Sequence, residues 1–506
     1  MLPVSRIGVS ALIDELVDRG TFVEWGPADL GIELDPGPPE GEYASELAKA
    51  REATGRTESV VVGTADIAGD RTVLLLGDFD FLAGSVGRAA CQLVIAAFDK
   101  ASELKLPVFA SPASGGTRMQ EGTAAFVLMA DVAAAAHRFR GTGNALVVWL
   151  RNPTTGGVMA TWGSLGSVTF GEPGALTGFL GPRVYQELMG EPFPANVQTP
   201  TNLADHGVID SAIEFSDLRR TVVNVFKVLS KRDHSTENAN PAAPETSLST
   251  PDPWECVLRT REPDRPTSAT LLQQNLTDVT LLSGTTEGQR SDAVTLALGC
   301  WRGVAVLVVA QDRAAQASGS PLNPASLRTA RRGFELANEL GLPVVSIVDT
   351  AGAELSVDAE QNALAGEIAR CLADLTSVAV PTVSVLLGMG CGGAALAMLP
   401  ADRVVSAEHG WVSPLPLEGA SIIRYRTPDR ASEMARSQEV AAWQLAERGI
   451  VDVVVREDRI APSEQPGFVD VVGRVVEYEL TSLQRQDSSE RLARRRARYH
   501  AGLANG

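Results

Sequence analysis

The sequence predicts an α/β protein built from one domain that occurs twice. The chain has 506 residues, which is enough for two to four domains at roughly 100–200 residues each. The segment 101–108 (ASELKLPV) returns at 337–344 as ANELGLPV, an offset of 236 residues. Within each copy, short β-rich runs alternate with glycine-rich turns and amphipathic helices. This alternation is typical of α/β domains with buried, largely parallel strands.

The duplication extends well beyond that one segment. The same offset relates Gly116 to Gly352, Gly156-Gly157 to Gly392-Gly393, and Glu172 to Glu408. Further on, 203–210 matches 445–452 at an offset of 242. A period of this length belongs to a whole domain, because solenoid repeats recur every 20–50 residues or so.

The strands and helices can be placed in order along each copy. In the first copy we expect strands at 107–111 and 145–150, turns at 113–116 and 154–157, and a helix at 120–138. In the second we expect strands at 343–348 and 382–387, turns at 350–352 and 390–393, and a helix at 359–375. Each turn directly joins a strand to a helix.

Composition shifts predict five segments. These are a helical leader (1–55), a first domain (56–230), a Pro- and Ser-rich linker (231–253), a second domain (254–480) and a basic tail (481–506). The tail carries arginines at 491, 494, 495, 496 and 498. We expect it to be a solvated terminal helix, with contact to an acidic partner as the alternative.

Charge and composition exclude several classes of function. The formal net charge of −18 disfavours nucleic acid as a partner. No apolar run approaches the length of a membrane span, and acidic residues within the first 20 positions argue against secretion, so we expect a cytoplasmic protein. The five cysteines are scattered and the five histidines isolated, so no metal site is expected.

The four glycine turns are the candidate sites of chemistry. A turn between a strand and a helix start presents free backbone N–H groups, which suit an oxyanion or a phosphate. Any one of them is more simply explained as a tight turn, but recurrence at a fixed offset in both copies weakens that explanation. No phosphate loop, dinucleotide fingerprint, nucleophile elbow or HExxH motif is present. The nearby acids Glu121, Glu172, Asp349 and Glu408 are expected to be structural acceptors rather than general bases.

Longer motifs around these turns resemble a known family. They are 113–122 (ASGGTRMQEG), 152–157 (NPTTGG) and 172–184 in the first copy, and 252–257, 261–266, 342–352 and 390–396 in the second. The first copy resembles the β subunit of acetyl-CoA carboxylase and the second its α subunit. The chain is therefore similar to the carboxyltransferase component of biotin-dependent acyl-CoA carboxylases, with both subunits fused, from Arg6 to about Val455.

The resemblance implies two tandem crotonase-like (ClpP/crotonase) ββα superhelical domains and transfer of a carboxyl group from N-carboxybiotin to the α-carbon of an acyl-CoA. Acetyl-CoA, giving malonyl-CoA, is the expected substrate. Gly115 and Gly116 would hold the thioester oxyanion, and Gly393 with Ala394 the ureido oxygen of biotin. Further substrate contacts are expected from Ser114, Thr117, Arg118, Gly156, Gly157, Gly178, Gly181, Gly352 and Gly392.

The resemblance also implies the partners. No covalently bound cofactor is expected, because carboxybiotin would arrive on a separate biotin carboxyl carrier protein, loaded by a separate biotin carboxylase. The chain would form a homo-oligomer, a dimer or a trimer of dimers, with each site shared between copy one of one subunit and copy two of another. Two alternatives stay open: a malonyl-thioester decarboxylase, and a catalytically silent CoA-binding or scaffold paralogue. Departures from the family pattern after Gly87 and Asp349 favour the paralogue, whereas the intact pairs Gly115-Gly116 and Gly392-Gly393 oppose it.

Overall fold

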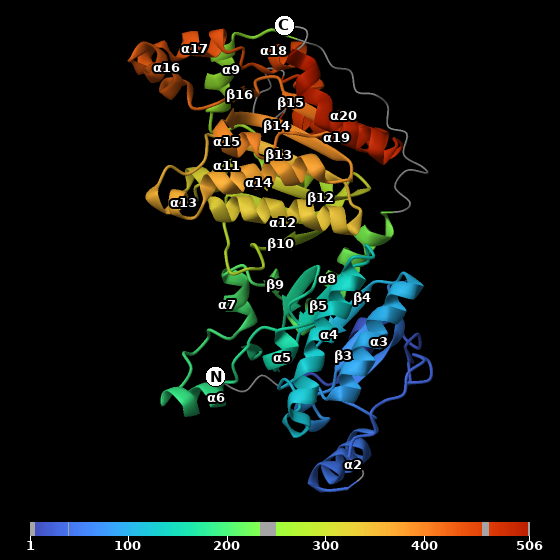
Figure 1. The fold of residues 1–506 in the computed structure, drawn as a ribbon. Coiled ribbons are helices and arrows are strands. Elements are labelled where there is room, and N and C mark those ends of the chain that lie inside the picture. The colour runs from blue at the N-terminus through green and yellow to red at the C-terminus, as the bar shows by residue number, and fades with distance from the viewer. Residues whose placement is uncertain (1–5, 39, 233–248, 458–464, 504–506) are drawn as a thin grey trace. The chain divides into compact units, whose positions relative to one another are not determined.

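The computed structural model describes residues 6–38, 40–232, 249–457 and 465–503, and the chain divides into two compact units (Figure 1). The first unit ends at Phe226, and the second begins at Lys227 and covers the rest apart from the turn Thr286–Gly288. Most of the linker predicted at 231–253 lies outside the described residues.

The first unit is built on a seven-stranded sheet with the order β1-β2-β3-β4-β5-β7-β9. Strands β1 to β3 pair antiparallel, and from β3 onward every neighbour is parallel. The strands are β1 (Val23–Glu24), β2 (Val60–Ile67), β3 (Asp70–Gly77), β4 (Val108–Ser111), β5 (Leu146–Leu150), β7 (Val168–Gly171) and β9 (Ser211–Ala212). Two short strands, β6 (Thr154–Thr155) and β8 (Thr177–Gly178), form a separate parallel pair.

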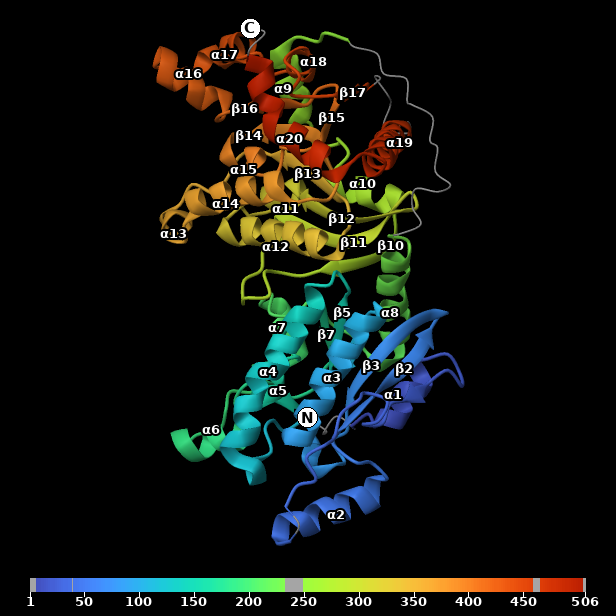
Figure 2. The ribbon, with the colours of Figure 1, turned by 45° about the vertical axis from the view of Figure 1, so that its right-hand side comes forward.

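Helices α3 (Arg88–Leu104) and α4 (Gly122–Arg140) lie side by side against this sheet (Figures 1 and 2). Their seam contains the rings of Phe98 and Phe139, whose centroids are 5.6 Å apart. The other helical elements are α1 (Val9–Leu16), α2 (Glu42–Thr54), η1 (Leu82–Gly84), η2 (Met119–Glu121), α5 (Gly156–Met159), α6 (Pro182–Met189), α7 (Pro200–Asp205) and α8 (Phe215–Ser230). The segment predicted as a helical leader thus also supplies the edge strand β1.

The second unit repeats this plan. Its sheet has the order β10-β11-β12-β13-β14-β15-β17, with β16 paired to β14. The hairpin of β11 and β12 is antiparallel, and β12 through β15 are parallel. The strands are β10 (Leu276–Leu282), β11 (Val294–Trp301), β12 (Val304–Gln311), β13 (Val344–Thr350), β14 (Thr382–Cys391), β15 (Arg403–Ala407), β16 (Trp411–Ser413) and β17 (Val453–Val455).

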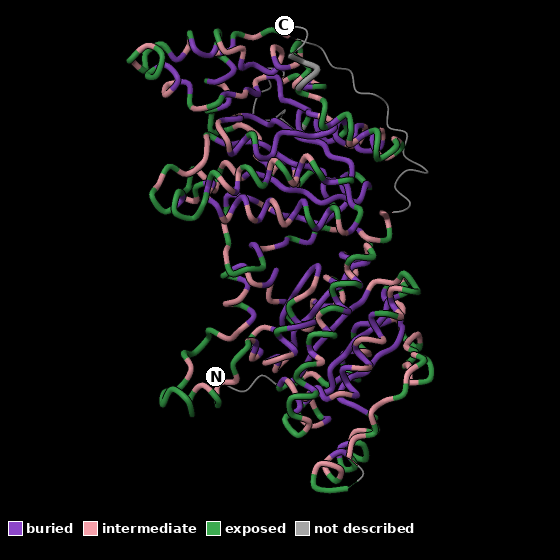
Figure 3. The backbone as a smooth tube through the Cα atoms, viewed as in Figure 1, coloured by how far each residue is buried: buried purple, intermediate pink, exposed green. Residues whose placement is uncertain are grey.

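Helices cover both faces of the second sheet, so its central strands are buried throughout (Figure 3). Helix α19 (Gln465–Gln484) packs on one face, and α12 (Pro324–Leu340) and α14 (Leu364–Ser377) lie on the other. The remaining helical elements are α9 (Pro253–Thr260), α10 (Ser268–Asn275), α11 (Arg313–Ala317), α13 (Val357–Gln361), α15 (Gly392–Leu396), α16 (Leu417–Tyr425), η3 (Pro428–Arg430), α17 (Ala431–Ser437), α18 (Ala442–Glu447) and α20 (Ser488–Leu503). The predicted α/β class with largely parallel strands is confirmed.

Two predicted elements differ from the structure. The helix expected at 359–375 is two helices, α13 and α14, because Ala363 between them has the left-handed φ of 66°. Strand β14 continues to Cys391, past the predicted end at 387, because its last residues pair with β16.

The prediction of a solvated basic tail is wrong for two of its arginines. Arg491 and Arg495 on α20 are only 4% and 3% exposed. The Arg495 guanidinium binds the carboxylate of Asp402 through both Nε (2.8 Å) and Nη2 (2.5 Å), and it also donates to the carbonyls of Leu375, Val378 and Val380. Burial of Arg495 is possible because each nitrogen of its guanidinium has an acceptor.

Within the described ranges, none of the helices has the length and apolar character needed to cross a bilayer. The same residues contain no group of three or more potential metal-ligating side chains.

Candidate active site

The first glycine turn follows strand β4 and is held to the segment before α3. The N–H of Val86 donates to the carbonyl of Gly116 (2.9 Å), and the N–H of Arg118 donates to the carbonyl of Val86 (2.9 Å). Gly116 has φ of 110°, a conformation that glycine adopts without the steric cost of a Cβ atom. The backbone on both sides of Thr117 is therefore fixed.

The second turn of the same unit lies directly against the first. Gly156, with φ of 60°, precedes Gly157 at the start of α5. A Cβ atom on Gly116 would lie 3.4 Å from Gly156 Cα and 3.7 Å from Gly157 N. The structure thus brings Gly116, Thr117, Gly156 and Gly157 together, with backbone facing backbone.

The amides that were predicted to hold the thioester oxyanion already have partners. Gly115 N–H donates to the carbonyl of Ala83 (3.0 Å), and Gly116 N–H donates to Ser114 Oγ (3.0 Å). In the part of the chain that the structure describes, the N–H groups of Thr117 and Gly157 have no hydrogen-bond partner. The expectation for Gly115 and Gly116 therefore needs a correction: the open donors are one residue further along, and one comes from each turn.

The second unit repeats several local features of these turns at the same offset of 236 residues. Gly352, with φ of 130°, donates its N–H to Thr350 Oγ1 (3.1 Å), as Gly116 does to Ser114. Glu354 N–H donates to the carbonyl of Leu322 (2.9 Å), as Arg118 does to Val86. Gly392 has φ of 69°, close to that of Gly156. Each glycine turn of the first unit therefore has a counterpart with a similar local conformation in the second unit.

The open amides of the second unit include the predicted pair. Among the described residues, no acceptor pairs with the N–H of Gly393 or Ala394, at the start of α15, or with that of Ala353. Ala353 is equivalent to Thr117, and Gly393 to Gly157. The sequence analysis missed Ala353 and emphasised the glycines, although the residue after each turn glycine was visible from the offset.

Two of the predicted substrate contacts are internal to the fold. Ser114 is 1% exposed and donates to the carbonyl of Gly84 (2.5 Å). Arg118 is fully buried and forms a bidentate pair with Glu58, with N–O distances of 2.7 and 2.6 Å. Burial alone would lower the pKa of Arg118, but Glu58 raises it above its ordinary value. Neither side chain is available to a ligand, so both predictions are corrected.

Gly178 and Gly181 belong to a segment that adjoins the second turn. Gly178 in β8 pairs with Thr155 in β6, and the carbonyl of Phe179 accepts the N–H of Gly156 (3.0 Å). Gly181 is the residue immediately before α6, and a Cβ added there would meet Val184 Cγ2 at 3.9 Å. The segment that contains both glycines is therefore joined to Gly156 through the backbone.

The acidic residues near the turns have structural roles, which confirms their prediction. Each carboxylate accepts a backbone N–H: Glu121 from Arg88 (2.6 Å), Glu172 from Asn152 (3.0 Å), Asp349 from Met389 (3.0 Å) and Glu408 from Glu457 (2.9 Å). Burial raises the pKa of Asp349 and of Glu172. One oxygen of each carboxylate is thus engaged in holding main chain.

Large apolar side chains are exposed beside the turns in both units. Met119 and its equivalent Leu355 are 82% and 96% exposed. Helix α6 and the residues before it expose Phe179, Leu180, Val184, Leu188 and Met189, and the equivalent helix α16 exposes Ile422 and Ile423. Contiguous exposed apolar groups mark interaction surfaces.

Comparison with known proteins decides the family. The model of the carboxyl transferase domain matches residues 30–495. The chain belongs to the carboxyl transferase family. A relative from Mycobacterium tuberculosis (strain ATCC 25618 / H37Rv), "Probable biotin-dependent acyl-coenzyme A carboxylase beta3 subunit", is 46% identical over 498 residues, covering 98% of each chain. The "Acetyl-coenzyme A carboxylase carboxyl transferase subunits beta/alpha" of Salinispora tropica is 34% identical, covering 99% of this chain and 92% of its own.

A solved carboxyl transferase structure shares the fold. The transcarboxylase 12S structure has a TM-score of 0.74 at 20% identity, and the match covers 95% of this chain and 91% of the other. The predicted class of two tandem crotonase-like domains is thereby confirmed. The molecule is the carboxyltransferase component of a biotin-dependent acyl-CoA carboxylase, as the motifs around its glycine turns predicted.

Proposed function

We propose that this carboxyltransferase moves a carboxyl group from carboxybiotin, held on a separate carrier protein, to the α-carbon of acetyl-CoA to give malonyl-CoA. The observation that carries the proposal is the pair of glycine turns, apposed in the first unit and present at the same offset in the second, that leaves Thr117 with Gly157 and Ala353 with Gly393 as open donors. Relatives named for acetyl-CoA carboxylase support the choice of acyl group.

The reaction needs two sites of this kind. Removal of the α-proton turns the thioester into an enolate, and release of carbon dioxide from carboxybiotin leaves negative charge on the ureido oxygen. Backbone N–H groups fixed in place stabilise such oxyanions without reorganising, and loss of one donor costs about 10²–10³ in rate. Thr117 and Gly157 serve the thioester oxygen, while Gly393, with Ala394 or Ala353, serves the ureido oxygen.

The proton is removed by the biotin nitrogen that has lost its carboxyl group. Support comes from the acidic residues near the turns, because one oxygen of each carboxylate accepts a backbone N–H. A carboxylate that holds main chain in this way is poorly placed to act as a general base.

We propose further that the active form is a homo-oligomer in which the turns of the first unit of one subunit meet those of the second unit of another. The exposed apolar groups of α6 and α16, with Met119 and Leu355, supply surfaces for such pairing. The transcarboxylase 12S structure is described as a hexamer assembly, which agrees with a trimer of dimers. The biotin carboxyl carrier protein and the biotin carboxylase are then separate partner chains.

The proposal is tested in the reverse direction with free biocytin as carboxyl acceptor. The purified chain is incubated with malonyl-CoA, and acetyl-CoA is measured with and without biocytin. Biocytin-dependent formation of acetyl-CoA supports the transferase. Loss of carbon dioxide without biocytin would identify a decarboxylase, and no turnover with any acyl group would identify a silent paralogue. Methylmalonyl-CoA and a longer carboxyacyl-CoA, run in parallel, test the preference for the acetyl group.

A further inference from the structure

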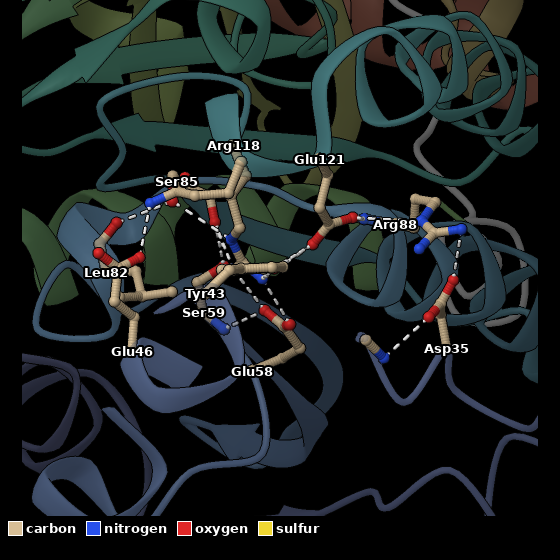
Figure 4. A network of polar contacts seen from close by, with 12 residues as sticks. Asp35, Tyr43, Glu46, Glu58, Ser59, Leu82, Ser85, Arg88, Arg118 and Glu121 are labelled. Carbon is tan, nitrogen blue, oxygen red and sulfur yellow. Dashed lines mark hydrogen bonds and ion pairs between the residues drawn. The ribbon is translucent and has the colours of Figure 1, made fainter. Parts of the chain in front are cut away.

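Arg118 is the centre of a buried polar network beneath the first glycine turn (Figure 4). Its guanidinium pairs with Glu58, which is 2% exposed, and donates from Nη2 to the carbonyl of Ser85 (2.7 Å). A charge pair removed from water to this degree is held in one geometry, because every departure leaves a buried charge unpaired.

The network is connected directly to the proposed oxyanion site. Arg118 follows Thr117, and its own N–H closes the bridge to Val86 that fixes the Thr117 backbone. The Arg118 Nε also contacts Ser85 Oγ (3.3 Å), next to Val86. A displacement of the Arg118 side chain would therefore move the backbone on both sides of the bridge, and with it the Thr117 N–H.

Two further residues complete the network from other parts of the chain. The Tyr43 hydroxyl on helix α2 donates to Glu121 Oε1 and accepts from Arg118 Nη1 (3.2 Å). The other oxygen of Glu121 accepts the N–H of Arg88 at the start of α3 (2.6 Å). Gly87 makes room for this meeting, because a Cβ there would lie 2.7 Å from Glu121 Cδ and 2.9 Å from Arg118 Nη1.

Helix α2 is anchored around the same point. Leu47 and Ala50 pack with Phe81, and Tyr43 and Leu82 border this small cluster. The Arg118 guanidinium lies over the Phe81 ring at 5.6 Å from its centroid. Burial, together with the bond to Glu121, raises the pKa of Tyr43 to about 12, so the phenol remains a donor across the working range.

We propose that Tyr43 and Glu121 are positioning residues for the oxyanion site of the first unit: they set Arg118, and through it the Thr117 amide that faces the thioester. Helix α2, far from the turn in sequence, is on this view part of the active unit. The inference rests on the proposed function. It predicts that residues outside both turns contribute measurably to kcat.

The test compares Tyr43→Phe with the control Gln120→Ala. Phenylalanine keeps the ring that packs beside Phe81 and removes only the hydroxyl. Gln120 also joins α2, through Glu46 Oε2 (2.9 Å), but this bond is exposed and involves neither Arg118 nor Glu58. Each variant is assayed for biocytin-dependent turnover of malonyl-CoA. The carbonyl stretch of bound ¹³C-labelled thioester is recorded by infrared difference spectroscopy, which reports the donors directly.

Because a small displacement of a reacting group costs up to about 100-fold in rate, we expect Tyr43→Phe to lower kcat about 10- to 100-fold with KM within about twofold. The thioester carbonyl frequency should move back toward its value in solution. Glu121→Gln, which keeps shape and removes charge, should shift both quantities in the same direction, and Gln120→Ala should match the wild type. If Tyr43→Phe fails to fold, Glu121→Gln provides the test in its place.

A Tyr43→Phe enzyme with wild-type kcat and carbonyl frequency would overturn the inference. So would a loss of kcat at an unchanged frequency, because the donors would then be undisturbed. Failure of the proposed function is a separate result: wild-type protein would show neither biocytin-dependent turnover nor a shifted carbonyl.

Discussion

Replacement of Gly116 by alanine tests whether the apposed turns of the first unit form part of the active site. The added Cβ would lie 3.4 Å from Gly156 Cα and 3.7 Å from Gly157 N, so it would occupy the space in front of an open donor. The residue would also be forced to keep φ of 110°, which costs an alanine about 1–3 kcal/mol of folding free energy. Two effects of different size are therefore expected, one on stability and one on rate.

The rate effect should exceed what the strain explains. Shielding one oxyanion donor lowers kcat about 10²–10³-fold, equivalent to roughly 2.7–4 kcal/mol. Gly69 provides the matched control, because it has φ of 87° at the hairpin of β2 and β3 with nothing within 4 Å of its Cβ position. Gly69→Ala should share the loss of stability and keep full activity.

The assay is the biocytin-dependent conversion of malonyl-CoA to acetyl-CoA, with unfolding followed by denaturant titration. Activity within about threefold of the wild type in folded Gly116→Ala would refute the assignment, since a crowded donor should cost far more. An equal loss of activity in Gly69→Ala would show that general strain, and not the site, is responsible.

Three other changes test separate parts of the structure. Glu58→Ala removes the bidentate partner of the fully buried Arg118 and leaves Glu121, 3.3 Å from Nη1, as a remaining counter-charge, so we expect a loss of about 3 kcal/mol in the free energy of unfolding by urea; a loss below about 1 kcal/mol would contradict the pairing. Burial alone would raise the pKa of Glu457, but His409 and Arg265 lower it to about 2. The stability from Glu457 is therefore present above about pH 4.5 and lost as the pH falls toward 2, a loss of roughly 3 kcal/mol. Glu457→Gln should remove this acid-dependent part of the unfolding free energy, and an unchanged pH dependence would speak against it. Leu188→Glu on α6, where the side chain is 76% exposed, should leave the fold intact while weakening oligomers in sedimentation velocity; wild-type sedimentation at low concentration would exclude α6 from the interface.

The repeat in the sequence predicted more than the fold class. An offset of 236 residues related Gly116 to Gly352, and in the structure each glycine N–H donates to a hydroxyl two residues earlier, that of Ser114 and that of Thr350. A duplicated sequence conserves local hydrogen bonding because those bonds join residues two apart. Anything determined within a few residues of the turn was therefore accessible from the pattern.

Features that depend on partners far away in the sequence could not be predicted from the sequence. Gly115 is unavailable as a donor because Ala83, more than 30 positions earlier, accepts its N–H. Arg118 resembles an anion-binding residue because it follows a glycine turn, yet its partner Glu58 lies 60 residues away. Neither pairing follows a sequence period or motif, because each forms only when folding brings distant segments of the chain together.

The clustered arginines of the tail misled the sequence analysis for a similar reason. Charge density alone indicates a solvated helix, but the inward face of α20 meets Asp402, whose carboxylate also accepts the N–H of Thr382 (2.9 Å). A single acidic residue in a loop, with the carbonyl groups of 375–380 around it, is enough to draw arginine side chains out of water.

The packing of α20 against Asp402 determines where the protein can be truncated, tagged or fused. A stop codon or proteolytic cut before residue 488 would delete both Arg491 and Arg495. Asp402 would then be left in the interior without these two ion-pair partners. The shortened product should be prone to degradation even though the glycine turns of both units are intact. Affinity tags are better joined at the other terminus, and fusion partners placed after the last helix need a spacer that does not pull it away.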